Sequence, residues 1–286
     1  MALAVSNTSQ ATSALASSLS WSHTQGSGSN RFLLVGIQLW TSGRKAISVL
    51  FGNTPMVLWK SMPEPGGFGT IEWWILFDPP VQTANIVATF SSSNYSHAGA
   101  ISFTGANTLN NPDKIIATMA LADAAASASG SVDLVTKYAN SIVVDNFFKR
   151  GSVALTVGAN QTQVENGADG TAMNGAMSYE SGGSAGSTIT MSWDGGSSNF
   201  FTSAIEIREL DTSAYEQEGY RWRDDDGSET TATFLASQDT EITRRKSLNT
   251  RLRIIMNATG NPVSNDFKLE YRRKGSGNTF SKMEVI

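Results

Sequence analysis

The chain has 286 residues, of which 40% are hydrophobic and 16% are charged, and its formal net charge at pH 7 is −4. This length suits one large domain or two unequal ones and is enough to bury a sizeable core. The slight acidic excess argues against broad binding to nucleic acids or anionic membranes. The absence of cysteine excludes disulfides, thiolate metal sites and cysteine nucleophiles.

The N-terminal sequence shows neither a basic region nor a clear apolar stretch. We therefore expect a protein that is made in the cytosol and is not exported by the general signal route. No run of about 18 consecutive apolar residues occurs, so a membrane-spanning helix is not expected. Because residues 2–20 are small and polar, we expect residues 1–20 to form an extended arm that adds to the sheet of a neighbouring subunit.

Charge divides the remaining chain into two regions. Residues 1–210 carry 13 acidic and 9 basic side chains, whereas the much shorter segment 211–286 carries 12 of each. Two domains with different surface chemistry are the simplest account. We expect a large domain over 21–210 and a small one over 211–286.

The first region shows one short apolar or alternating run after another, separated by Gly, Asn, Ser and Pro. Such spacing is typical of an all-β sandwich, and we expect a jelly-roll-like one. One stretch competes with this interpretation, because the alanine-rich segment Ala117–Ser129 could form a short helix or a loop. The expected strands are 31–40, 46–51, 70–77, 85–90, 98–103, 115–121, 141–148, 153–157, 176–179, 188–193 and 201–207.

The second region is also β-like. In Thr250–Asn257, Leu252 and Ile254 alternate with Arg251 and Arg253, so one face of this strand is solvated and the other is buried. Similar runs at 220–223, 231–236, 267–273 and 280–286 predict a small immunoglobulin-like sandwich of about five to seven strands.

Aromatic residues supply the first interface candidates. Trp73 and Trp74 are adjacent, so in a strand they face opposite sides. We expect one ring in the core and the other against a second subunit or a ligand, with core and interface favoured over a sugar platform. In the second region Trp222 lies between Arg221 and Arg223, and these three are further interface or ligand candidates.

Acidic residues supply one weak metal candidate. Asp224 and Asp226 precede Gly227, and Glu229 follows, which partly resembles a calcium loop without its spacing. The competing interpretation, which we favour, is a polar turn whose carboxylates pair with nearby arginines. No cofactor and no other metal site is expected.

Candidates for catalysis are few. Two histidines occur, His23 and His97, and neither stands near a recognisable nucleophile motif, so surface or strand-edge positions are expected. Glu72 lies beside the two tryptophans, a texture found at sugar sites and also on ordinary strands. Glycoside hydrolysis needs an opposed second carboxylate, so we do not expect an enzyme.

The C-terminal segment carries a family resemblance. Residues 220–233 read YRWRDDDGSETTAT, and RLR follows at 251–253 and LEYR at 269–272. This segment resembles a small β module of virion-associated proteins of tailed bacteriophages. Residues 18–35, with WSH and the GSGS loop, resemble the opening of a β-sandwich domain in similar proteins. The resemblance implies a structural role on the phage particle and brings no catalytic residues.

We therefore expect a virion structural protein, made in the host cytoplasm, that serves as a capsid decoration protein or as a head or tail appendage. Its expected partners are other virion proteins, such as the major capsid or tail protein, and further copies of itself, with a trimer preferred. The alternative is a carbohydrate- or receptor-binding module of a fibre or a cell-surface adhesin, with a host glycan as partner. Neither nucleic acid nor a membrane is expected as a partner.

Overall fold

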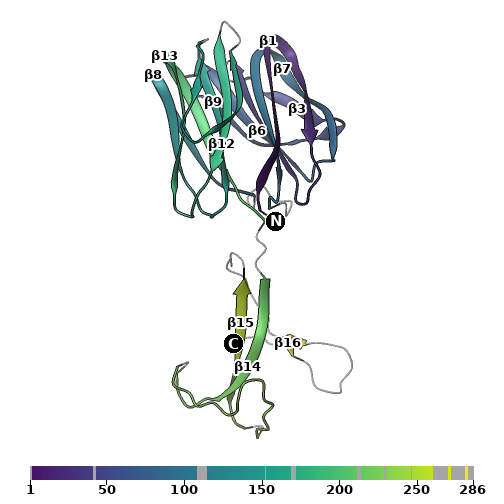
Figure 1. The fold of residues 1–286 in the computed structure, drawn as a ribbon, viewed down its shortest axis with the longest axis vertical. Coiled ribbons are helices and arrows are strands. Elements are labelled where there is room, and N and C mark those ends of the chain that lie inside the picture. Colours follow the sequence, from purple (N-terminus) through teal and green to yellow (C-terminus); the bar gives the residue numbers. More distant parts are fainter. Residues whose placement is uncertain are drawn as a thin grey trace. The chain divides into compact units, whose positions relative to one another are not determined.

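The computed structural model describes residues 2–40, 43–107, 115–151, 153–168, 172–210, 214–228, 230–245, 247–259, 270–271 and 281–282. The chain forms two compact units, Met1–Leu210 and Asp211–Ile286 (Figure 1). Every named element among the described residues is a β-strand, and all the pairings are antiparallel, which confirms the expected all-β class. No helix long and apolar enough to cross a membrane occurs in these ranges.

The first sheet of the first unit contains β1 (Ala4–Gln25), β2 (Phe32–Trp40), β3 (Ala46–Phe51), β4 (Thr54–Pro55), β5 (Val57–Pro63), β6 (Gly69–Phe77) and β7 (Gln82–Thr104). The strand order is β4-β3-β7-β2-β6-β5, and β1 pairs with β7 along its length. The two ends of this order, β4 and β5, are separated in the chain by Met56 alone, whose N–H donates to Val49 O over 2.9 Å. The sheet therefore curls into a nearly closed barrel.

The second sheet repeats this arrangement with β8 (Ile116–Val135), β9 (Ile142–Arg150), β10 (Thr156–Val157), β11 (Thr162–Ala168), β12 (Met173–Ser181) and β13 (Thr188–Ile207). The long strand β8 pairs with β13 as β1 does with β7, and β9 lies between β12 and β13 as β2 does between β6 and β7. β10 and β11 take the places of β3 and β5. The first unit therefore consists of two halves with the same strand order.

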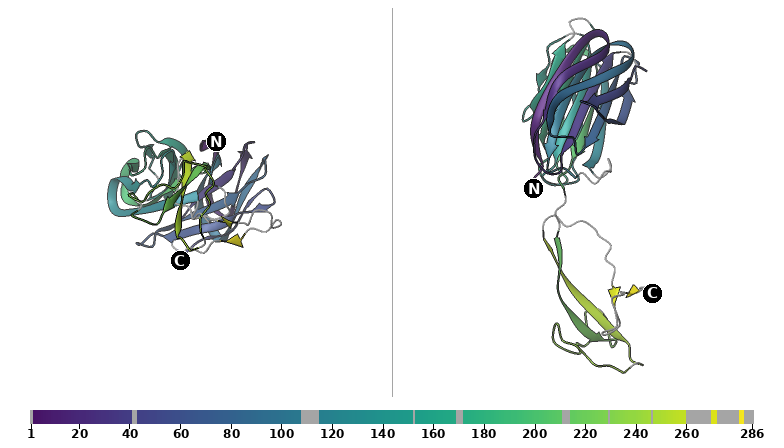
Figure 2. Two further views of the ribbon diagram at one scale, coloured as in Figure 1. Left: turned by 90° about the horizontal axis from the view of Figure 1, so that it is seen from below. Right: turned by 90° about the vertical axis from the view of Figure 1, so that its right-hand side faces the viewer.

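Apolar residues fill both the space between the sheets and the inside of each sheet. The inter-sheet core draws on both halves, with Phe32, Trp73 and Ile101 from the first and Phe148 and Ile205 from the second. A separate cluster that includes Leu33, Trp74 and Phe51 fills the curl of the first sheet. Figures 1 and 2 show the teal and green strands of the second half against the purple and blue strands of the first.

The second unit has its own pairing. β14 (Ala214–Asp224) pairs with β15 (Thr250–Thr259), and β16 (Glu270–Tyr271) pairs with β17 (Ser281–Lys282). Arg223 is buried, donates to Ala232 O and lies with Arg221 over the ring of Phe234. These contacts hold the chain that follows β14 against that strand.

Three expectations differ from the structure. The segment expected as an arm lies in β1 and pairs with β7 of its own chain, because Val5 packs on the inter-sheet core and Leu19 on the core of the first sheet. Ala117–Ser129 is neither helix nor loop but part of β8, because pairing with β13 overrides alanine propensity.

The third difference lies in the small unit. Residues 231–236 make a single bridge, Arg223 to Phe234, in place of the expected strand. Backbone hydrogen bonds from Asp224 N to Thr233 O and from Leu235 N to Trp222 O hold this segment to β14. Side chains add to them, since Asp226 accepts the Thr233 N–H and Arg221 donates to Ala236 O. The rest of 267–273 and 280–286, apart from 270–271 and 281–282, lies outside the described residues.

Candidate interaction surfaces and buried polar sites

The two adjacent tryptophans of β6 are both buried. Trp73 is 0% exposed and donates from Nε1 to Ser203 Oγ over 2.9 Å, which joins β6 to β13. Trp74 is 5% exposed and faces the opposite side, in the core of the first sheet. The expected opposite orientation is confirmed, but the expected surface ring is wrong, because the curl of the sheet covers its second face. Neither ring is available to a sugar or a partner.

Glu72 lies inside the first sheet and is also fully buried. Its carboxylate accepts hydrogen bonds from Trp74 Nε1 over 2.9 Å, from Ser61 Oγ over 3.1 Å and from Ala46 N over 3.2 Å. Burial raises the pKa of this carboxyl group, and the three donors oppose the shift. These contacts join β3 and β5 to β6. Glu72, which was considered as a sugar-site carboxylate, therefore has a structural role inside the barrel.

His23 is buried rather than superficial. Its Nδ1 lies 2.7 Å from Ser9 Oγ and its Nε2 lies 2.6 Å from Ser102 Oγ, while Trp21 Nε1 donates to the same Ser9 hydroxyl. Burial lowers the pKa of this histidine to about 4, so the ring is neutral at pH 7. Solvent does not reach the His23 side chain, so the ring is not an accessible base. Its contacts with the two hydroxyls hold β1 to β7.

His97 is buried between the two sheets. Its Nδ1 lies 3.1 Å from Thr12 Oγ1 on β1 and 3.5 Å from Glu165 Oε1 on β11. Both the histidine and the glutamate are fully buried, and burial raises the pKa of Glu165. Sequence reasoning placed His97 on the surface and missed Glu165, because no pattern links two residues 68 positions apart.

Asp145 is a second buried carboxyl group that the sequence did not single out. Its Oδ1 accepts the backbone N–H of Ser178 over 2.6 Å and the Ser178 hydroxyl over 2.9 Å, and its Oδ2 accepts Trp193 Nε1 over 2.6 Å. Burial raises its pKa to about 7 in spite of these donors, with a smaller contribution from the charge of Glu165. The network fastens β9 to β12 and β13.

In the second unit, the carboxylates considered for calcium have protein partners. Asp224 pairs with Arg244, and Asp226 accepts the Thr233 N–H over 2.8 Å. Glu229 lies outside the described residues. Within the parts of the chain that the structure describes, no three His, Asp or Glu side chains gather as a metal-binding group.

The arginines flanking Trp222 both lie over the ring of Phe234. Arg223 is 3% exposed, and Arg221 lies 3.6 Å from the centre of the Phe234 ring. Trp222 itself is half-buried and packs edge-on to Tyr220, with ring centres 6.2 Å apart. Of these three interface candidates, Trp222 and Arg221 retain part of their surface.

An uncharged face covers part of β1 and β7, which pair without interruption from Ser18–Thr89 to Gln25–Gln82. Alternate side chains point outward and are exposed or half-exposed, and Thr24 and Thr83 join their hydroxyls across the pair over 2.9 Å. The eight residues of this serine–threonine face are Ser18, Ser20, Ser22, Thr24, Thr83, Asn85, Val87 and Thr89. None of them carries a charge.

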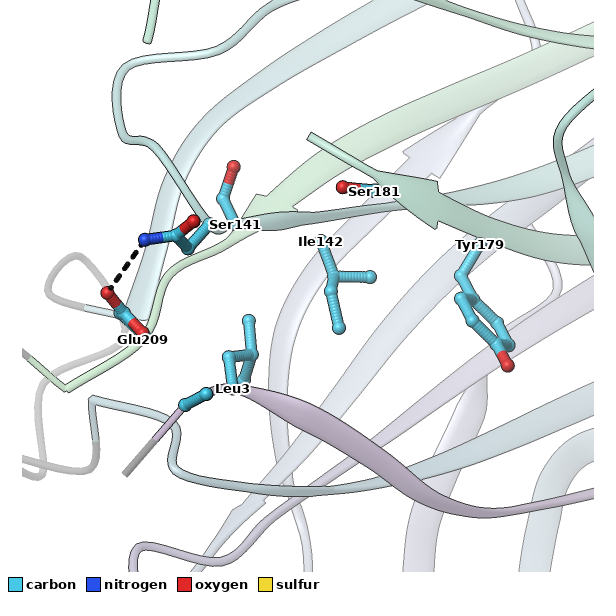
Figure 3. A pocket seen from close by; sticks show the side chains of 8 residues that line it. Leu3, Ser141, Ile142, Tyr179, Ser181 and Glu209 are labelled. Carbon is cyan, nitrogen blue, oxygen red and sulfur yellow. Dashed lines mark hydrogen bonds between the residues drawn. The ribbon is translucent and has the colours of Figure 1, made fainter. Parts of the chain in front are cut away.

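One pocket opens at the end of the first unit where β1 begins (Figure 3). Its volume is about 520 Å³, and Leu3, Ile142 and Tyr179 provide its apolar surface. Asn140 donates to Glu209 Oε1 over 3.4 Å at one side, and the hydroxyls of Ser141 and Ser181 complete the lining. An apolar floor with a polar rim suits a small neutral ligand with hydroxyl groups.

Comparisons with known proteins add no relative: no protein-family model, no curated protein and no solved structure matches the chain. The class of protein therefore rests on the fold alone. It is an all-β protein of antiparallel sheets, with one nearly closed sheet, a second sheet packed on it and two small two-stranded sheets among the described residues.

Proposed function

We propose that the chain is a structural protein of a tailed-phage virion, a capsid decoration protein or a head or tail appendage that acts through protein–protein contacts. It would be made in the host cytoplasm and be located on the virion. Its partners would be the major capsid or tail protein and further copies of the chain, with a trimer preferred. We further propose that residues 21–210 form a jelly-roll-like sandwich and residues 211–286 an immunoglobulin-like one.

The serine–threonine face is the observation that supports this proposal best. Burying a charged side chain at an interface carries a large desolvation penalty, which small uncharged side chains avoid. The strands beneath are fixed by continuous pairing and by a packed core, so little conformational entropy is lost when a partner covers them. A stiff and uncharged sheet face is well suited to contact with another β-protein.

The test places charge on this face. In the double variant Ser20→Arg, Ser22→Arg both changed side chains point to solvent, so the variant should fold normally. We expect wild-type protein to co-sediment with purified particles of the phage that encodes it, and the double variant to lose at least about tenfold in affinity. The matched control is Ser184→Arg, Ala185→Arg, which puts the same charge on an exposed turn elsewhere in the unit.

Electron microscopy of intact particles supplies the second readout. Density for two connected β-units at a fixed position on the head or tail would support the proposal. Particles that contain no copy of the chain, together with purified protein that binds no particle, would refute it. Equal binding by both arginine variants would keep the virion role but exclude this face.

The pocket of Figure 3 favours the alternative, a carbohydrate- or receptor-binding module. The ring of Tyr179 and the side chains of Leu3 and Ile142 would cover the apolar face of a sugar, and the polar rim would bind its hydroxyls. Binding on a glycan array that Tyr179→Ala abolishes and Tyr179→Phe preserves would favour this alternative. An array without binding would remove it.

A further inference from the structure

Four arginines form two cross-strand pairs on one face of the ribbon that β14 and β15 make in the second unit (Figure 1). Arg221 stands opposite Arg253, and Arg223 stands opposite Arg251. Side chains of directly opposed residues share a face, with Cβ atoms about 4.5–5.5 Å apart, and like charges in such positions destabilise the strand pairing. Two successive pairs of this kind therefore need counter-charges.

An acidic partner is present for only one of these two pairs. Arg251 forms an ion pair with Asp225, and its neighbour Arg223 is buried inside the unit. In contrast, no carboxylate in the part of the chain that the structure describes forms an ion pair with Arg221 or Arg253. The pair of Arg221 and Arg253 thus carries two positive charges without a counter-charge from the chain.

Arg221 is held in place by contacts that leave the end of its side chain available. Its Nε donates to Ala236 O over 3.0 Å, and its guanidinium carbon lies 3.6 Å from the centre of the Phe234 ring. The two terminal nitrogens have no partner among the described residues. A guanidinium group fixed in this way loses little conformational entropy on binding, and its terminal N–H groups can donate two parallel hydrogen bonds to an oxyanion. Arg253 is exposed and supplies a second guanidinium group from the opposite strand.

The acidic groups of the neighbouring turn do not block this position, because other arginines bind them. Asp224 pairs with Arg244. Asp225 accepts a hydrogen bond from Nε of Arg251 over 2.7 Å and a further one from Asn249 over 3.3 Å. The turn therefore places its carboxylates on arginines other than the exposed pair.

We propose that Arg221 and Arg253 bind a phosphate monoester group, either of a sugar phosphate or as inorganic phosphate. Such a group carries about −1.5 to −2 charges at pH 7, which matches two guanidinium groups, whereas a carboxylate carries only one. The planar donors of arginine also fit the oxygen atoms of phosphate in a bidentate way. The site lies within the second unit, and the inference does not depend on the proposed virion role.

The experiment titrates the full chain with inorganic phosphate, glucose 6-phosphate and acetate by isothermal titration calorimetry in a phosphate-free buffer. We expect saturable binding of both phosphates with dissociation constants below about 10 mM, and at least about tenfold weaker binding of acetate. Tighter binding of glucose 6-phosphate than of inorganic phosphate would support a sugar phosphate as the ligand. Equal affinities would support recognition of the phosphate group alone.

Arg253→Gln tests the assignment to these residues. The loss of charge-assisted hydrogen bonds should weaken phosphate binding about 10- to 100-fold. The matched control is Arg245→Gln, which makes the same change in net charge at another exposed arginine of the unit and should bind phosphate as wild type does. Because Arg253 is exposed and its removal relieves a like-charge pair, Arg253→Gln without ligand should unfold at the same temperature as wild type or at a higher one.

Three results would overturn the proposal. The first is the absence of saturable binding of either phosphate below about 10 mM. The second is binding of acetate as tight as that of phosphate, since the site would then not distinguish two charges from one. The third is an equal loss of phosphate binding in Arg253→Gln and Arg245→Gln, which would trace the binding to net charge and not to this pair.

Discussion

The histidine between two serines makes the stability of the first unit depend on pH. His23 has a pKa of about 4 when folded and an ordinary value of 6.5 when exposed, because burial disfavours its charged form. A histidine whose pKa falls on folding contributes stability that is complete above pH 6.5 and is lost as the pH falls towards 4. The difference corresponds to about 3 kcal/mol, at about 1.4 kcal/mol per pH unit.

The perturbation that isolates this contribution is His23→Gln, which cannot titrate. At pH 7.5 the variant should be less stable than wild type by about 1–3 kcal/mol, because the hydroxyls of Ser9 or Ser102 lose a partner. Between pH 6.5 and 4 that disadvantage should shrink and then reverse, since only wild type must keep a buried ring neutral. Other titrating groups are common to both proteins and cancel in the difference.

Urea unfolding from pH 4.0 to 7.5, followed by tryptophan fluorescence, measures this difference. All tryptophans except Trp222 belong to the first unit, so the signal reports mainly on its unfolding. Ser102→Ala is the control, because it removes one hydroxyl but leaves the histidine to titrate. A stability gap between wild type and His23→Gln that stays constant with pH would refute the reasoning.

The remaining predictions concern two other buried groups. Burial raises the pKa of Asp145 from 3.8 to about 7, so its contribution to folding stability is complete below pH 3.8 and is lost as the pH rises through 7. Urea unfolding should therefore show wild type losing stability relative to Asp145→Asn over this pH range. Wild type gaining stability relative to Asp145→Asn as the pH rises would contradict this prediction. Trp73→Phe should cost about 1–3 kcal/mol because Ser203 loses its donor, whereas Trp59→Phe should cost under about 1 kcal/mol in thermal unfolding. Equal losses would contradict this prediction.

The sequence predicted the short strands better than the long ones. The expected runs at 31–40, 46–51 and 70–77 match β2, β3 and β6 within a residue or so. In β2 and β6 the reason is that nearly continuous apolar side chains mark strands buried on both faces. β7 and β13 were each expected as two strands. In β7 the middle segment around Ser91 is exposed, so its pattern fades although the pairing with β1 continues with bulges.

The buried polar groups could not be predicted from the sequence. Alternation along β6 placed Trp73 and Trp74 on opposite faces, but only the curl of the sheet buries both. Glu165 lies in a polar stretch whose composition indicates an exposed strand. It is buried because β11 packs next to β1 and β7 of the other half. Contacts between distant strands leave no local periodicity to detect.

The repeated strand order makes each half of the first unit dependent on the other for its folding. Phe32, Trp73 and Ile101 on one half are covered only because Phe148 and Ile205 on the other half lie against them. Either half, produced as a separate fragment, would expose this apolar surface to water and would need a partner to cover it. The two fragments, mixed after separate purification, should reassemble into the native unit.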